Sequence, residues 1–141
     1  MKIAITLTVL ATGLLLAAGD SQFDAGKKIR ELHKERIATL RQFADQSIAG
    51  SKVGDISVEE GVQARLLLLN AELEASETLE ERIKFHQNIV KLLKEKETNM
   101  VDAVRTGVVN TTMILKAKAD RLKAEIALEE AKVKGVARQA Q

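Results

Sequence analysis

One stretch of sequence occurs twice: residues 54–76 read GDISVEEGVQARLLLLNAELEAS, and residues 107–129 read GVVNTTMILKAKADRLKAEIALE. Five of the 23 aligned positions are identical, and each copy begins at a glycine. The segments that precede the two copies also share a motif, since the letters ERI occur at 35–37 and again at 81–83. An internal repeat of this kind indicates one structural unit that is used twice.

The repeated unit is predicted to be a pair of helices joined at its glycine, because apolar residues recur at three-and-four spacing on both sides of it. The glycines that begin the two copies are 53 residues apart, whereas the two ERI motifs are 46 residues apart. The difference is seven residues, which is one heptad. A whole heptad lengthens a helical arm without turning its apolar seam away from the partner helix. We therefore predict an all-α fold with two tandem antiparallel hairpins, packed as a four-helix bundle or an extended rod. Hairpin one covers 24–77 and turns near 50–56, and hairpin two covers 78–138 and turns near 106–110.

Each expected helix carries a mainly apolar stripe, and we predict that the apolar members of each stripe are buried. Helices are expected to start at Ser57, which has Glu60 three residues on, and at Thr78, which has acidic residues in the first turn after it. A charged set in the third helix is expected to be solvated: Lys91, Lys94, Glu95, Lys96 and Glu97. The predicted stripes, in chain order, are Ile29, Leu32, Leu40, Phe43 and Ser47; Val62, Leu66, Leu69 and Leu73; Ile83, His86, Val90, Leu93, Glu97, Met100 and Val104; and Leu115, Ala119, Leu122, Ile126, Val133 and Val136.

The first 19 residues are predicted to be a signal peptide and not part of the helical domain, which then covers 20–141. Lys2 precedes an apolar run that extends from Ile3 to Ala18, and small residues at 17–19 are typical of a cleavage site. The alternative is a retained membrane anchor, which normally requires about 20 apolar residues. We therefore expect an exported protein that is periplasmic or associated with the outer membrane.

Composition argues against several classes of function. The chain has no cysteine, which excludes disulfides, thiolate metal sites and a lipoprotein anchor. Its 22 basic and 20 acidic residues do not supply the basic face that nucleic-acid binding needs. Neither a Gly-x-Ser-x-Gly nucleophile motif nor a glycine-rich phosphate loop occurs. The only histidines, His33 and His86, have no acidic residue or second histidine at a ligating helical spacing.

These observations predict a protein that is not an enzyme and has no metal site, no cofactor and no small-molecule substrate. Glu72 and Glu125 recur in the repeat, and paired carboxylates can do acid–base work. Because both lie on charged, regular helices, we interpret them instead as structural residues. Arg121, four residues before Glu125, is placed for a favourable pair along the helix.

The repeated hairpin resembles the periplasmic tip of TolC-type outer-membrane efflux proteins. In that family a long helix ends at a Val-Gly or similar turn, and the returning helix carries an alanine ten residues after the glycine. Here Ala64 follows Gly54 at this spacing, and Ala117 follows Gly107. The resemblance covers roughly residues 35–132. The strands that family members insert before and between their hairpins have no counterpart in this sequence.

The resemblance implies that the protein docks through the tips of its hairpins, since the family's tip contacts the periplasmic adaptor of an efflux pump. Ordinary helix stops are the alternative interpretation of both glycines. We expect partners to be further copies of this chain, favoured by the wide apolar faces of the returning helices, or an efflux adaptor or outer-membrane channel. The alternatives are a periplasmic holdase chaperone and a structural coiled-coil scaffold. The candidate tip residues are Val53, Gly54, Ile56, Gly107, Val108 and Val109.

Overall fold

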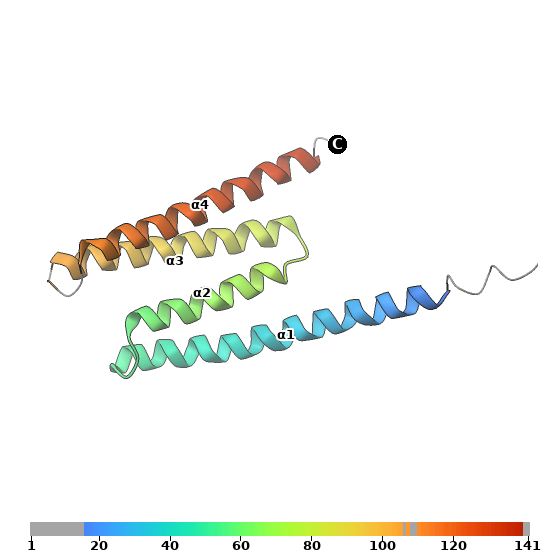
Figure 1. The fold of residues 1–141 in the computed structure, drawn as a ribbon, viewed down its shortest axis with the longest axis horizontal. Coiled ribbons are helices and arrows are strands. Elements are labelled where there is room, and N and C mark those ends of the chain that lie inside the picture. Colours follow the sequence, from blue (N-terminus) through green and yellow to red (C-terminus); the bar gives the residue numbers. More distant parts are fainter. Residues whose placement is uncertain (1–15, 106, 108–109, 140–141) are drawn as a thin grey trace, which may run out of the picture.

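The computed structural model describes residues 16–105, 107 and 110–139, and these residues form four helices and no strand. The helices are α1 (Leu16–Val53), α2 (Val58–Glu74), α3 (Leu79–Arg105) and α4 (Thr111–Gln139). Each runs antiparallel to the one before it (Figure 1), which confirms the all-α fold of two tandem hairpins. Most of the predicted signal peptide lies outside the described residues. Within them, no helix is long and apolar enough to cross a membrane.

The helices α2 and α3 start after the two capping residues that the sequence predicts, Ser57 and Thr78, and each of these residues forms a capping box. The backbone N–H of Glu60 donates to Ser57 Oγ over 3.1 Å, and the Ser57 N–H donates to the Glu60 carboxylate over 3.0 Å. Thr78 and Glu81 exchange the same two bonds at the start of α3, each of 3.2 Å. Such bonds satisfy amide groups that the first turn of a helix leaves without partners.

The four helices form one open layer. Among the described residues, α1 packs on α2, α2 on α3 and α3 on α4, and no other pair of helices is in contact. Figure 1 shows them side by side, with α1 and α4 at opposite edges. Of the two arrangements left open by the sequence, the described residues do not form the closed bundle.

The core is thin and is centred on α3, because the inner helices α2 and α3 have a neighbour on each side while α1 and α4 have one. The stripe predicted for α3 is half-buried or buried throughout, and the stripe of α2 is half-buried. Buried apolar side chains lie at Ala44, Ala64, Ala71, Ile89, Val90, Leu92, Leu93, Ala117 and Leu128.

The predicted stripe of α1 is only partly buried. Ser47 is buried and Leu40 half-buried, but Ile29, Leu32 and Phe43 are exposed. The shorter α2 ends at Glu74, whose carboxylate pairs with Arg36, so the part of α1 before this pair extends past its neighbour. The contacting face is also turned toward the small residues Ala44 and Ser47, which leaves Phe43 outside.

The prediction that the apolar stripe of α4 is buried is wrong. Every residue of that stripe is exposed: Leu115, Ala119, Leu122, Ile126, Val133 and Val136. Instead, α4 packs on α3 through a face of smaller side chains that includes Ala117, which is 1% exposed, and Gly135, where an added Cβ would lie 2.5 Å from Leu79 Cδ2. The large apolar residues lie on the other side because α4 is an edge helix with one neighbour.

Candidate functional site

Both glycine turns lie at the same end of the layer, on the left in Figure 1. We call the turn between α1 and α2 the first tip and the turn between α3 and α4 the second tip. Gly54 has φ of 86° and Gly107 has φ of 74°, a left-handed conformation that side chains disfavour and glycine adopts freely. Open space surrounds the position where either glycine would carry a Cβ. Glycine is therefore required at these turns by backbone conformation and not by crowding.

The first tip is closed by hydrogen bonds to one carbonyl. The Gly50 oxygen accepts from the N–H groups of Asp55 and Ile56 over 3.0 and 3.3 Å. The Ile56 side chain packs over Gly50, so that a Cβ added at Gly50 would lie 2.9 Å from Ile56 Cγ1. Ile56 is therefore half-buried and stabilises the turn, while Val53 is 72% exposed.

The predicted tip residues thus divide into three groups. Val53, Gly54 and Gly107 are exposed at the tips, and Ile56 is half-buried beneath the first tip. Val108 and Val109 lie outside the described residues. The structure places the exposed members at one end of the molecule, although the two glycines are 53 residues apart in the sequence (Figure 1).

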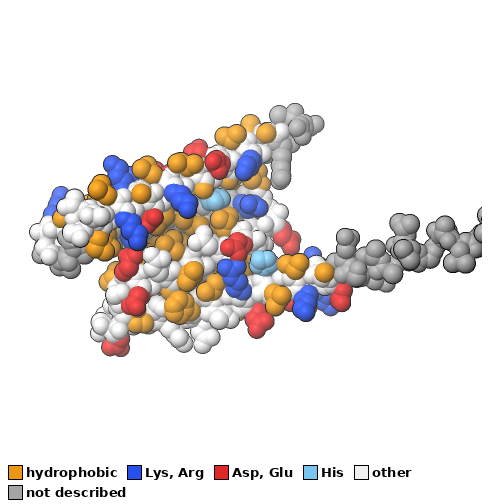
Figure 2. Space-filling view, viewed as in Figure 1, with side chains coloured by type: hydrophobic (Ala, Val, Ile, Leu, Met, Phe, Trp, Pro, Cys, Tyr) orange, Lys and Arg blue, Asp and Glu red, His pale blue; other side chains and the backbone are white. Residues whose placement is uncertain are grey.

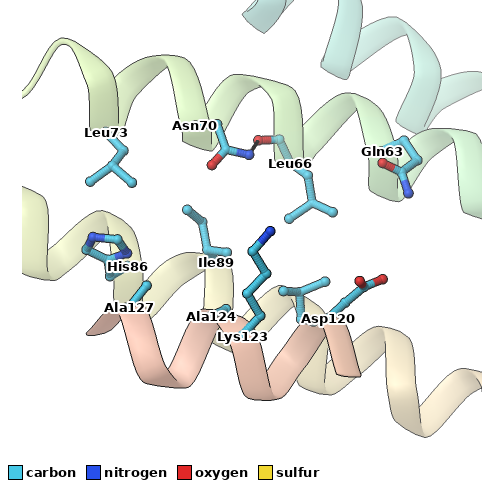
Figure 3. A pocket seen from close by; sticks show the side chains of 11 residues that line it. Gln63, Leu66, Asn70, Leu73, His86, Ile89, Asp120, Lys123, Ala124 and Ala127 are labelled. Carbon is cyan, nitrogen blue, oxygen red and sulfur yellow. Dashed lines mark hydrogen bonds between the residues drawn. The ribbon is translucent and has the colours of Figure 1, made fainter. Parts of the chain in front are cut away.

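A groove of about 350 Å³ lies where α2, α3 and α4 meet. Because α2 and α4 do not contact each other, α3 forms its floor with Ile89 and Leu93. Figure 3 shows Leu66 and Leu73 entering from α2, and the Lys123 side chain reaching from α4 toward α2. Sequence reasoning missed this groove, since it depends on which helices touch. The remaining lining residues are Gln63, Asn70, His86, Asp120, Ala124 and Ala127.

Two polar residues that line the groove, His86 and Asn70, have defined environments. Burial, assisted by the charge of Arg82, lowers the pKa of His86, which keeps its imidazole neutral at neutral pH. The Asn70 amide is engaged, since it donates to the Leu66 carbonyl over 2.8 Å. His33 lies on α1, which does not contact α3, so the two histidines are not brought together. In the part of the chain that the structure describes, no group of three or more His, Asp or Glu could hold a metal ion.

Ion pairs link each helix of the layer to the next. Glu72 accepts a hydrogen bond of 2.7 Å from Arg41, and Glu125 pairs with both Arg121 at 2.7 Å and Lys94 at 3.1 Å. The carboxylates that recur in the repeat are therefore partners of basic side chains. The hydrogen bond from Lys94 lowers the pKa of Glu125, and together with Arg121 it outweighs the opposite effect of burial. Arg121 also pairs with Glu97 on α3.

Lys96 departs from the solvated position predicted for it. Its side chain is only 7% exposed, and its Nζ lies 2.6 Å from the Glu59 carboxylate in the first turn of α2. The second oxygen of that carboxylate is buried without a hydrogen-bond partner. The sequence contained one signal of burial, since Lys96 falls seven residues after Ile89 and four after Leu92, which are both buried. That spacing places it on the core side of α3.

Comparisons with known proteins identify no family for this chain. No protein-family model matches the chain, and no curated protein or solved structure matches it.

Proposed function

We propose that this protein is an exported, non-enzymatic interaction protein that docks its two tips onto a component of a cell-envelope assembly. The observation that carries this proposal is the placement of both glycine turns at one end of the layer (Figure 1). A partner that approaches this end meets two related turns side by side in one molecule. The favoured partner is the periplasmic adaptor of an efflux system, because the repeated hairpin resembles the part of TolC-type proteins that contacts it.

The surface of the first tip supports this proposal. Val53 and Val58 flank the turn and are 72% and 63% exposed, so a large apolar side chain is open to solvent on each side of it. Gly54 between them carries no side chain and has no neighbour within 4 Å of the Cβ position, so another backbone can approach the turn closely. Exposed apolar groups around an accessible backbone suit a protein–protein contact.

Photocrosslinking in intact cells tests this proposal. A photoreactive residue replaces Asp55 at the first tip, and the matched control replaces Glu77, another exposed acidic residue, in the turn at the opposite end of the layer. We expect position 55 to give one defined adduct that contains an efflux adaptor, and position 77 to give none. Adducts of equal yield at both positions, or none at position 55, would contradict docking through the tips.

A holdase chaperone is the second candidate, and the groove is the observation that favours it. Its floor and one wall are lined by Ile89, Leu93, Leu66 and Leu73, which could hold an apolar segment of an unfolded chain. The test is suppression of aggregation of an unfolded outer-membrane protein. If the groove binds the client, Ala127→Arg should fill it and abolish suppression, whereas Glu80→Arg on the exposed start of α3 should not. A wild-type chain without suppression would exclude this candidate.

A further inference from the structure

The outward side of α4 carries a regular heptad seam. Counting from Leu115, its residues alternate at spacings of four and three: Leu115, Ala119, Leu122, Ile126, Glu129, Val133 and Val136. We call this set the α4 seam. All seven are exposed, and the five largest apolar members have between 43% and 67% of their surface open to solvent. Figure 2 shows apolar side chains recurring along the upper edge of the molecule, over α4.

The α4 seam is not needed to hold α4 in the layer, because the opposite face of the helix already does so. That face packs on α3 through Ala117, Leu128 and Gly135, all of them buried. Apart from Leu128, the inner face therefore consists of small residues, and the large apolar residues of the seam lie outside. A helix that is apolar on two sides is normally covered on both. No described helix supplies the second cover, since α1 lies at the far edge of the layer.

The spacing of the α4 seam specifies what kind of surface fits it. An alternation of three and four matches another helix that has the same repeat. The seam extends over residues 115–136, about 33 Å at 1.5 Å per residue. Because α3 already holds α4 in helical form, pairing along the seam does not include the cost of forming that helix. A second α4 meets these requirements in length and in period.

Charges beside the seam decide between the two directions of pairing. Lys116, Lys123 and Glu130 flank one side, and Lys118, Glu125 and Lys132 flank the other. A parallel, in-register pair sets Lys118 against Lys123 of the partner subunit and Glu125 against Glu130 of the partner subunit. Both are like-charge contacts, which disfavour this arrangement.

An antiparallel pair reverses the sign of these contacts. When Leu122 packs against Val133 of the partner subunit, Lys123 comes opposite Glu130 of the partner subunit, which its side chain reaches by turning away from the groove. Glu125 then faces Lys132 of the partner subunit. Each of these pairs joins a lysine to a glutamate, so the charges are opposite. Two-fold symmetry repeats each pair once more in the dimer. Glu125 already binds Arg121 and Lys94 in its own chain. The contacts between Lys123 and Glu130 therefore report more directly on the direction of pairing.

We propose that a second copy of this chain covers the α4 seam, with α4 packed antiparallel on α4 of the partner subunit about a two-fold axis. The pairing joins two four-helix layers edge to edge, and it sends the tips of the two copies to opposite ends of the dimer. It does not depend on the proposed docking of the tips, since the seam and the tips involve different residues.

Disulfide trapping tests both the pairing and its direction, because the natural chain has no cysteine. Full-length chains that carry Leu122→Cys and a mass tag are mixed under reducing conditions with untagged chains that carry Val133→Cys, and then oxidised. Antiparallel pairing predicts a disulfide between a tagged and an untagged chain. Disulfides within each variant would overturn the proposal in favour of parallel pairing. No trapping above an exposed Glu80→Cys control would overturn the proposal altogether.

Charge reversal gives a second readout that does not rely on cysteine. In the antiparallel dimer, Lys123→Glu turns two attractive contacts into repulsive ones and should raise the dissociation constant about tenfold in sedimentation equilibrium. The double variant with Glu130→Lys restores opposite charges and should recover the affinity. In a parallel dimer the same single substitution would relieve repulsion from Lys118. Tighter association of Lys123→Glu would therefore contradict the antiparallel arrangement.

Discussion

At the scale of single residues, Gly54 determines the path of the first tip. Its φ of 86° is disfavoured for a residue with a Cβ, and no atom lies within 4 Å of the Cβ position, so any penalty comes from the backbone alone. We expect Gly54→Ala to lower the free energy of unfolding by about 1 kcal/mol. Urea denaturation followed by circular dichroism measures this change.

Gly54→Asn is the matched control, because asparagine tolerates the left-handed region better than alanine does. It should therefore cost less than Gly54→Ala. Equal stability of wild type and both variants would show that the chain does not turn through a left-handed residue at position 54.

Glu59 makes the stability of the fold depend on pH. Its partial burial alone would raise its pKa, but hydrogen bonds from Lys96 and Gln63, with the charges of Lys96 and Lys116, outweigh burial and hold the pKa below 4.5. A carboxyl whose pKa is lowered in the folded state stabilises that state above its unfolded pKa and loses this effect as pH falls through the folded value. The contribution of Glu59 should therefore be complete above about pH 5 and lost in more acidic solution.

Glu59→Gln tests this pH dependence. About 38% of the Glu59 side chain is exposed, so solvent screens the pair with Lys96. For this reason we expect a loss of only about 1 kcal/mol at pH 7. In urea denaturation, the difference from wild type should shrink as the pH falls below the ordinary pKa of a glutamate. A difference that stayed constant between pH 7 and pH 3 would contradict this account of the Lys96–Glu59 pair.

Residue-scale prediction from sequence succeeded where the deciding interaction is local. The sequence predicts helix starts at Ser57, from Glu60 three residues on, and at Thr78, from the acidic residues in the first turn after it. The structure contains capping bonds at both positions. Burial of Lys96 could not be predicted in this way, because the residue that covers it, Glu59, lies 37 positions away on another helix.

At the scale of elements, the sequence indicated where each helix begins and ends better than which of its faces is buried. In α4 the stripe of large residues was predicted to be inside, but the structure buries the face that contains Ala117. The spacing of apolar residues indicates that a helix has an apolar face. It does not indicate whether that face is buried within the chain or is covered by another molecule. When a helix has two such faces, residue size alone does not decide which one packs within the chain.

Two substitutions on opposite faces of α4 test this assignment. Ala117 is 1% exposed, so Ala117→Leu should overpack the contact with α3 and lower the free energy of unfolding by about 1–3 kcal/mol. Leu122 is 43% exposed, so Leu122→Ala should cost less than about 1 kcal/mol in the monomer. Denaturation at protein concentrations low enough to keep the chain monomeric compares the two. A cost above 2 kcal/mol for Leu122→Ala, typical of a core leucine, would show that the buried face is the other one.

At the scale of the whole molecule, the two hairpins were predictable and their open arrangement was not. Short connections force α2 beside α1 and α3 beside α2, because a few residues can only join antiparallel neighbours. Nothing in those connections decides whether α4 turns back onto α1. That choice depends on the faces of α1 and α4, which the sequence assigned only in part.

The groove and the α4 seam both depend on this open layer. If α1 packed against α4 in solution, it would cover the α4 seam and close the groove between α2 and α4. The tips would still lie at one end, but the molecule would be a compact bundle with no free apolar edge. The distance between the two edge helices is therefore the quantity on which the account depends most.

Pulsed electron paramagnetic resonance can measure that distance between two spin labels. The labels are attached at Gln42→Cys on α1 and Lys134→Cys on α4, which are both exposed positions. The labelled chain is diluted with unlabelled chain so that signals between copies are suppressed. Neighbouring helix axes are about 8–10 Å apart, so three steps across an open layer predict a separation of roughly 25–30 Å between the axes of α1 and α4. A single population with the two axes roughly 10 Å apart, as in a closed bundle, would contradict the open layer and the surfaces proposed on it.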